Sequence, residues 1–146
     1  MKDVLEWVDS RKPGVTETEI NRAEEQLGIR LPAEYKELFT LTNNAQVDEW
    51  TFFPIKDPAN LKKTWDDLVR QNNELRDEGM PEDLIAIAED ETGDLLCYRR
   101  TEEGIDERVY LWDHETGERE ELASGLREFI LSYEALEKDW EAEALD

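Results

Sequence analysis

The stretch INRAEEQLGIRLPAEYKELFTLTNN, residues 20–44, predicts two helices separated by an enforced stop. Thr16 and Glu19 stand three residues apart, as a capping box requires, so we expect the first helix to begin there. Its apolar residues recur at helical spacing and define a buried side, and the polar residues between them are expected to face outward. The buried side is Ile20, Ala23 and Leu27, and the outward residues are Glu24, Glu25 and Gln26.

The stop between the two helices is Gly28, followed closely by Pro32. Glycine takes the left-handed conformation that satisfies the last carbonyls of a helix, and proline opens a helix where its missing N–H is not needed. Ile29 and Leu31 lie between them and are expected to pin the corner. The second helix is expected to bury Tyr35, Leu38, Phe39 and Leu41, and to end at Thr42, Asn43 and Asn44.

This run resembles the helical signature of the SUKH superfamily, the Smi/Knr-like proteins. The pattern Ile-x-x-Ala-Glu-x-x-Leu-Gly-Ile-x-Leu-Pro-x-x-Tyr is matched at residues 20–35 nearly residue for residue. Asn44 stands where the family most often has Gly, and asparagine is the next most tolerant residue for a positive φ angle, so the turn is expected to survive. The similarity continues as far as Phe129, through residues 84–88, 92–94, 109–113 and 122–124.

The resemblance implies a protein-binding domain that acts either as an immunity protein against a polymorphic toxin, often a nuclease, or as a regulator linked to cell-wall synthesis. The family's partner surfaces vary while its scaffold stays, so the resemblance does not place an interface. The motif residues are assigned to fold maintenance because each has an adequate structural reason. They are Gly28, Leu31, Pro32, Tyr35, Asn43, Gly93 and Asp94.

Length and composition indicate one domain over residues 1–146, because 146 residues lie within the usual single-domain range. No apolar run approaches the ~20 residues of a membrane span, and the start MKDVLEWVDS lacks the features of a secretory signal. We therefore expect a cytoplasmic protein. Cys97 is the only cysteine, which excludes an internal disulfide and agrees with a reducing compartment.

The formal charge of −22 is concentrated in the second half of the chain. Residues 1–73 carry 14 acidic and 10 basic residues, whereas residues 74–146 carry 25 and 7. A negative field repels nucleic acids and anionic membranes, and it attracts basic proteins. We therefore expect a basic protein partner, with no nucleic acid and no membrane. The alternative is that the acidity only favours solubility.

The rest of the chain predicts an α+β fold, with an antiparallel sheet packed against about four helices. A short helix is expected around Val4 to Val8, an aromatic strand at 50–55, and a helix from Asp57 to about Leu75 with Leu61, Trp65, Leu68 and Val69 on one face. Four short runs separated by turns then predict a β-meander from 84 to 122, with the apolar run 109–112 at its centre and the charged run 119–122 at its edge. A last helix is expected after Ser124, with a stripe from Leu126 to Trp140.

No catalytic, cofactor-binding or metal-binding motif is present, so no cofactor is expected and the protein is expected to be no enzyme. His114 has no nucleophile at a recognisable spacing, and Cys97 within a predicted strand indicates a small buried residue. Glu89, Asp90, Glu91 and Asp94 are interpreted as the acidic rim of a hairpin turn rather than a cation site. A carboxylate-based enzyme remains a third, weaker hypothesis, because so many acids produce chance pairs.

The five tryptophans divide by position. Trp7, Trp65 and Trp112 fall on apolar faces and are predicted to lie in the core. Trp50 and Trp140 lie at the ends of predicted elements, where a half-exposed indole beside acids is a candidate anchor for a partner, although rim packing is the plainer reading.

The leading hypothesis is therefore an immunity protein that docks on a basic, possibly nucleolytic, toxin domain by charge and by steric blocking. The alternative is a regulatory or scaffold domain of the cell-wall type. The candidate partner-binding residues are the acidic turns of the second half and one aromatic residue. They are Trp50, Glu89, Asp90, Glu91, Glu102, Glu103, Asp106 and Glu107.

Overall fold

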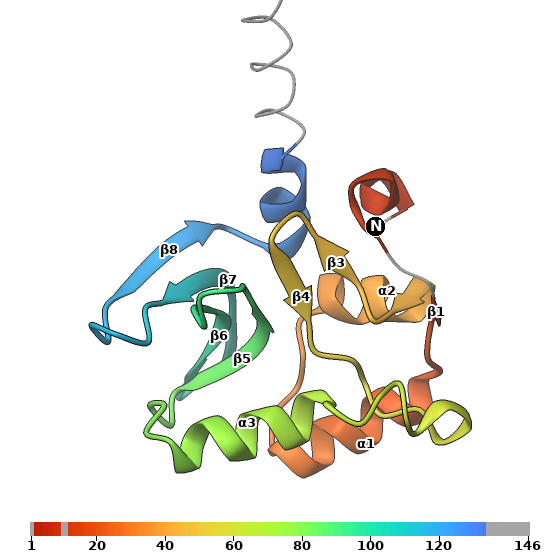
Figure 1. Cartoon of the computed structure of the whole chain (residues 1–146), viewed down its shortest axis with the longest axis horizontal. Helices are drawn as coiled ribbons and strands as arrows, with labels where there is room; N and C mark the ends of the chain where they lie inside the picture. The colour runs from red at the N-terminus through yellow and green to blue at the C-terminus, as the bar shows by residue number, and fades with distance from the viewer. Residues whose placement is uncertain (1, 10–11, 134–146) are drawn as a thin grey trace, which may run out of the picture.

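The computed structural model describes residues 2–9 and 12–133, in which a six-stranded antiparallel sheet follows the chain order β3-β4-β5-β6-β7-β8 (Figure 1). A separate two-stranded sheet pairs β1 with β2. The strands are β1 (Lys12–Pro13), β2 (Thr42–Asn43), β3 (Gln46–Val47), β4 (Trp50–Phe52), β5 (Leu84–Glu89), β6 (Leu95–Thr101), β7 (Gly104–Trp112) and β8 (Arg119–Ala123). The α+β class and the antiparallel meander predicted from the sequence are confirmed.

The helical segments of the described chain precede, separate and follow the strands. They are the 3-10 helices η1 (Lys2–Trp7) and η2 (Pro58–Asn60), the α-helices α1 (Glu17–Leu27), α2 (Ala33–Leu41) and α3 (Leu68–Asp77), and a helical segment over residues 126–133. Figure 1 shows α1 and α3 side by side along one border of the molecule. Within the described residues, no helix combines the length and apolar composition that crossing a membrane requires.

The boundaries of α1 are those that the sequence predicts. Thr16 and Glu19 form the capping box at its start, with the Thr16 N–H donating to the Glu19 carboxylate at 3.1 Å. Gly28 ends it at φ 69°, in the left-handed conformation, and its N–H reaches the carbonyl of Glu24 at 2.9 Å. Pro32 is the residue before α2 rather than its first helical residue.

Glu24 was expected to face outward, and the structure shows it buried. Its carboxylate accepts the N–H of Leu31 at 2.7 Å and lies 3.2 Å from the Nζ atom of Lys36. A buried carboxylate is tolerated only with such partners. The side chain therefore ties the end of α1 to the linker and to α2, and periodicity could not reveal this because it treats every glutamate as solvent-facing.

The buried side of α2 packs against the sheet through aromatic rings. Tyr35 and Phe39 stack with ring centroids 4.3 Å apart. Tyr35 also meets Tyr98 of β6 edge to face at 6.1 Å, and Phe39 lies 6.5 Å from Phe52 of β4. Aromatic pairs at these separations add to the free energy gained from burial, so α2 is firmly fixed over β4 and β6.

Side chains from α3 complete the edge of β5 that the short strand β4 leaves unpaired. Strand β4 pairs only with Ala88 and Glu89 of β5. The amide of Asn72 binds both backbone groups of Ala86 at 2.8 Å, and Arg76 donates to the carbonyl of Leu84 at 2.9 Å. Buried backbone groups are therefore satisfied by a helix where a strand is missing.

The helix predicted from Asp57 to Leu75 is wrong in its first half. Residues 58–60 form a 3-10 turn, residues 61–66 form turns, and α3 begins only at Leu68 because the Asp67 carboxylate caps the N–H of Arg70 at 3.0 Å. Leu61 and Trp65, which we expected to be buried, are exposed. Both lie before the cap, where helical spacing no longer governs their direction.

The centre of the sheet also differs from the prediction. Residues 84–88 and 95–98 are buried throughout, whereas most of the predicted central run in β7 is only half-buried. The sequence showed the meander but not that β3 and β4 extend the sheet beyond β5, which moves the middle to β5 and β6. Strand β8 lies at the edge, as its charged residues predict.

The C-terminal part of the chain is described to residue 133. Leu126, Phe129 and Ile130 are buried there, in agreement with the predicted stripe, and the N–H of Ser124 donates to the Glu128 carboxylate at 3.1 Å. Leu136, Trp140 and the acidic tail after it lie outside the described residues.

A first prediction concerns Glu24. We expect Glu24→Ala to lower the free energy of unfolding by about 2 kcal/mol, because the buried N–H of Leu31 loses its acceptor. Glu25→Ala, an exposed neighbour on the same helix, is the matched control and should change stability by less than about 0.5 kcal/mol. Urea denaturation of the three proteins measures this, and equal effects of both substitutions would contradict the role given to Glu24.

Candidate functional site

The acidic residues predicted to bind a partner form two groups at opposite ends of β6. Glu102 and Glu103 make the β6–β7 turn, followed by Asp106 and Glu107 in β7. Residues 89–91 belong to the end of β5 and the β5–β6 turn. Because β6 has seven residues, the two turns are about 20 Å apart. The structure therefore does not bring all the predicted residues together.

The first group contains three exposed carboxylates, those of Glu102, Glu103 and Glu107. Within residues 2–9 and 12–133, no lysine or arginine forms an ion pair with any of them. Their carboxylates therefore face solvent without an ion-pair partner, and exposed unpaired carboxylates attract a cationic ligand.

Asp106 differs from its neighbours because protein groups already bind it. Its carboxylate accepts the N–H of Arg108 at 3.0 Å and the hydroxyl of Tyr110 at 2.9 Å. Partial burial opposes ionisation, yet these hydrogen bonds and the nearby Arg108 guanidinium hold the pKa of Asp106 below its ordinary range. It is better suited to hold β7 in shape than to bind a partner.

The first group lines a groove of about 1070 Å³ between the β6–β7 turn and the corner that joins α1 to α2. One hydrogen bond holds the two walls of the groove together. The Arg100 guanidinium donates to the carbonyl of Leu27 at 2.9 Å, which joins the end of β6 to the end of α1. The acidic residues that line it are Glu17, Glu24, Glu25, Glu102, Glu103 and Glu107, and the basic ones are Arg30, Lys36 and Arg100.

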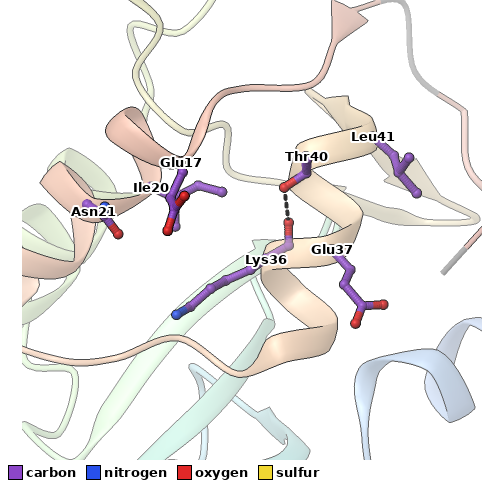
Figure 2. Close-up of a pocket in the computed structure, with 7 residues that line it drawn as sticks. All are labelled: Glu17, Ile20, Asn21, Lys36, Glu37, Thr40 and Leu41. Carbon is purple, nitrogen blue, oxygen red and sulfur yellow. Dashed lines mark hydrogen bonds between the residues drawn. The ribbon is translucent and has the colours of Figure 1, made fainter.

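The groove continues into a smaller pocket of about 540 Å³ between α1 and α2, whose lining is drawn in Figure 2. Both spaces are lined by Glu17, Asn21 and Lys36, so the groove and the pocket form one continuous depression. Ile20 and Leu41 give the pocket its apolar character. Sequence reasoning missed this pocket, because it arises where two helices meet and neither helix shows it alone.

The second acidic group lies where several loops carry like charges. Burial raises the pKa of Glu89, and the carboxylates of Asp66 and Asp90 raise it further. The pKa of Glu49 is raised for the same reasons, by burial and then by Asp48 and Asp90. The structure thus gathers acids from three segments here, although the sequence indicated only the β5–β6 turn.

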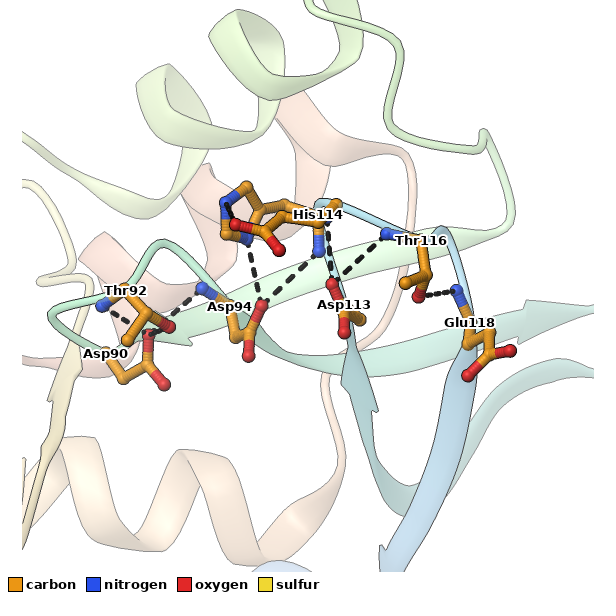
Figure 3. A network of polar contacts seen from close by, with 8 residues as sticks. Asp90, Thr92, Asp94, Asp113, His114, Thr116 and Glu118 are labelled. Atoms are coloured by element: carbon orange, nitrogen blue, oxygen red, sulfur yellow. Dashed lines mark hydrogen bonds and ion pairs between the residues drawn. The ribbon is translucent and has the colours of Figure 1, made fainter.

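A network of polar contacts joins this turn to the one between β7 and β8 (Figure 3). The Asp90 carboxylate accepts the N–H groups of Thr92 and Asp94 at 2.9 and 3.0 Å, which closes the first turn. Asp94 in turn lies 2.9 Å from Nδ1 of His114, and Asp113 accepts the N–H of Glu115 at 2.8 Å.

Asp94, Asp113 and His114 form the one group of three potential metal ligands among the residues that the structure describes. Oxygen and nitrogen atoms of these residues already make hydrogen bonds within the two turns. Asp94 contacts His114, and Asp113 accepts the N–H groups of Glu115 and Thr116. The arrangement explains the fold of the turns and needs no ion to do so. The interpretation of residues 89–94 as a hairpin turn is confirmed.

The prediction that Trp50 is a half-exposed anchor is wrong. Its side chain is 2% exposed, and its indole Nε1–H donates to the hydroxyl of Tyr133 at 3.1 Å. The indole therefore supports the helical segment that follows Ser124. The exposed tryptophan of the described chain is Trp65, at 61%, with the Arg70 guanidinium 3.8 Å from its ring centroid. Trp7 and Trp112 pack partly buried against the core.

Cys97 lies in the middle of β6 and is buried. Burial raises the pKa of its thiol to about 12, so the thiolate is almost absent at neutral pH. This agrees with the sequence interpretation of a small core residue.

Comparison with known protein families shows which family this chain belongs to. The family model described as SMI1-KNR4 cell-wall, SUKH_5, matches residues 1–135. The chain belongs to the SUKH family. No match was found among curated proteins. The resemblance predicted from residues 20–35 is thus confirmed over most of the chain.

The motif residues of this SUKH domain serve its structure. Gly28 allows the corner, the N–H of Leu31 binds Glu24, and Tyr35 stacks on Phe39. The side chain of Asn43 binds both backbone groups of Ile55, at 2.9 and 3.0 Å. Asn44 has a φ of 53°, which confirms the turn expected at the position where the family most often has glycine. The motif residues therefore build the α1–α2 wall of the groove, whereas Glu102, Glu103 and Glu107 on the other wall lie outside the motif.

A second prediction concerns His114. The hydrogen bond that His114 Nδ1–H donates to the Asp94 carboxylate raises the pKa of the imidazole above the ordinary 6.5, so the contact stabilises the fold fully below pH 6.5 and is lost as pH rises through the raised value. An NMR titration should give a pKa above 6.5 and a lower one in Asp94→Asn. Glu115→Gln, which removes a carboxylate 4.0 Å away, should lower it less. An equal fall in both variants would contradict the assignment.

Proposed function

We propose that this SUKH domain is a non-catalytic immunity protein of the cytoplasm that neutralises a basic toxin domain, such as a nuclease, by covering its cationic surface. The groove between the β6–β7 turn and the α1–α2 corner is the docking surface. The observation that carries the proposal is the set of exposed carboxylates of Glu102, Glu103 and Glu107, which no basic side chain of the described chain neutralises.

The mechanism is electrostatic and steric. A nuclease needs a basic surface to hold the phosphates of its substrate. The exposed carboxylates carry negative charge as those phosphates do, so they can bind the same basic surface. Complementary charge raises the rate of encounter, and the folded body then blocks access of the nucleic acid. No bond needs to be made or broken, which agrees with the buried thiol and the structural role of the His114 cluster.

The contrast with the rest of the sheet supports this site. Asp83 forms a bidentate contact with Arg119 at 2.6 and 2.8 Å, and Arg108 pairs with Glu121 at 3.2 Å. Arg99, Arg108 and Arg119, on β6, β7 and β8, thus pair with other acids. The glutamates of the β6–β7 turn have no such ion pair within the described residues, so their charge is available to a partner.

A second candidate is a regulatory domain, since the description of the matching family names the cell wall. Such a domain would also bind a protein, and the same groove would serve. The genomic neighbourhood separates the two functions. A gene for a large secreted protein with a basic C-terminal domain directly upstream favours immunity, whereas an isolated gene among cell-wall functions favours regulation.

A third prediction tests the docking surface. The partner is first captured with the full chain from its native host and identified. We expect its association with the chain to slow on the order of tenfold between low and physiological salt, because charge guides the encounter. The triple variant Glu102→Gln, Glu103→Gln, Glu107→Gln should slow association to a similar extent, while its melting temperature stays nearly unchanged. Stopped-flow fluorescence measures the rates.

The matched control removes three other exposed carboxylates, with Glu78→Gln, Glu118→Gln and Glu120→Gln. It has the same net charge but leaves the groove intact, so its association rate should fall much less. Equal slowing by both triple variants would show that only total charge matters. A rate independent of salt would contradict the mechanism itself.

A further inference from the structure

The pocket between α1 and α2 differs in chemistry from the groove that it joins. Ile20 and Leu41 line it, together with Lys36, Glu37 and Thr40, whose side chains also contain aliphatic carbons (Figure 2). Its volume of about 540 Å³ is in the range of sites that enclose small ligands. A large apolar side chain would gain free energy by leaving water there.

The other end of the depression is acidic in balance, because six glutamates and three basic residues line the groove there and two of those three basic residues are already engaged. Lys36 pairs with the buried Glu24 at 3.2 Å, and Arg100 binds the carbonyl of Leu27 at 2.9 Å. The exposed carboxylates of Glu102, Glu103 and Glu107 surround that end. It is therefore suited to a guanidinium or ammonium group, and it would repel an acidic segment.

The distance between the two ends follows from α1. Ile20 lines the apolar pocket and Gly28 lines the acidic end, eight residues farther along the chain. A helix rises 1.5 Å per residue, so the ends are roughly 12 Å apart. An extended peptide covers that length in about four residues.

We propose that the depression binds an extended segment of the partner with a large apolar residue in the pocket and an arginine or lysine about four residues away at the β6–β7 turn. The inference rests on the proposed function in taking the partner to be a basic protein, and it adds the chemistry and the spacing of what is recognised. Glu17 and Lys36 both lie on the shared wall between the two ends, so the residues between the anchors are expected to carry no net charge.

The test uses three synthetic peptides of six residues and the isotopically labelled full chain in NMR titrations. The first has tryptophan first, arginine fifth and sixth, and glycine or serine between them. The second replaces the tryptophan with alanine. The third has the same composition as the first but places both arginines directly after the tryptophan.

We expect the first peptide to bind about tenfold more tightly than the second, because burial of the indole is lost. It should also bind more tightly than the third, which reaches only one end at a time. The first peptide should shift the amide signals of residues 40–41 and of residues 101–104 together. Equal binding of all three peptides would overturn the inference, since it would show attraction by charge alone.

Two matched variants place the site on the protein. Thr40 is exposed and lines the pocket, and its hydroxyl donates only to the carbonyl of Lys36 at 2.7 Å. Thr40→Arg should fill the pocket with a cation and weaken binding of the first peptide about tenfold. Thr18→Arg, at an exposed position of α1 outside both spaces, adds the same charge and should have little effect. Circular dichroism confirms that both variants fold.

The same variants separate this inference from the proposed function. If the captured partner binds Thr40→Arg and Thr18→Arg equally well, the apolar anchor is wrong although an acidic immunity surface stands. If the first peptide binds as expected while the captured partner is no toxin, the immunity function is wrong and the recognition chemistry stands. Peptide binding that Thr40→Arg leaves unchanged overturns the site.

Discussion

The candidate site depends on the contacts of the buried Glu24 carboxylate. It holds the N–H of Leu31 and the ammonium of Lys36, so the end of α1, the linker and α2 meet at one point. Burial of a charge is unfavourable unless such partners are present, which makes the corner a rigid unit rather than a flexible hinge. With Arg100 bound to Leu27 next to it, the corner fixes where the β6–β7 turn stands. The groove is the space between these two fixed walls.

The corner also explains how charge is distributed around the groove. Of the three basic residues that line the groove, Lys36 and Arg100 are engaged with α1. Elsewhere, arginines of β7, β8 and the segment at 126–133 pair with Asp106, Asp83 and Asp3. The glutamates of the β6–β7 turn therefore remain exposed and unneutralised. Pairing within the fold thus engages several of the cations, and these glutamates keep their charge exposed.

The sequence predicted the parts of the fold that local chemistry controls. The capping box at Thr16, the left-handed Gly28 and the strand alternation all act over a few residues, so a single chain shows them. The sequence predicted Trp50 to be half-exposed and Trp65 to be buried, and the structure shows the reverse, because the exposure of each depends on contacts outside its own segment. Trp50 is hydrogen-bonded to Tyr133, and Trp65 lies before the Asp67 cap, outside α3. The middle of the sheet was misplaced since strand order beyond the meander is a long-range property.

The candidate site was predicted only in part for the same reason. The exposure of Glu102, Glu103 and Glu107 follows from a charged two-residue turn, which a sequence displays. The opposite wall of the groove includes Glu17 and Glu25, which lie more than 70 residues earlier in the chain. Nothing in the spacing of acids links the two walls. A pocket between helices likewise requires the packing angle, which no periodicity provides.

Hydrogen–deuterium exchange of the chain, alone and bound to its captured partner, tests the central claim most directly. The account predicts slower exchange in the complex at residues 28–31 and 101–104, on the two walls of the groove, with little change at the β5–β6 turn. Protection confined to residues 90–94 and 61–66, with the groove unchanged, would contradict it.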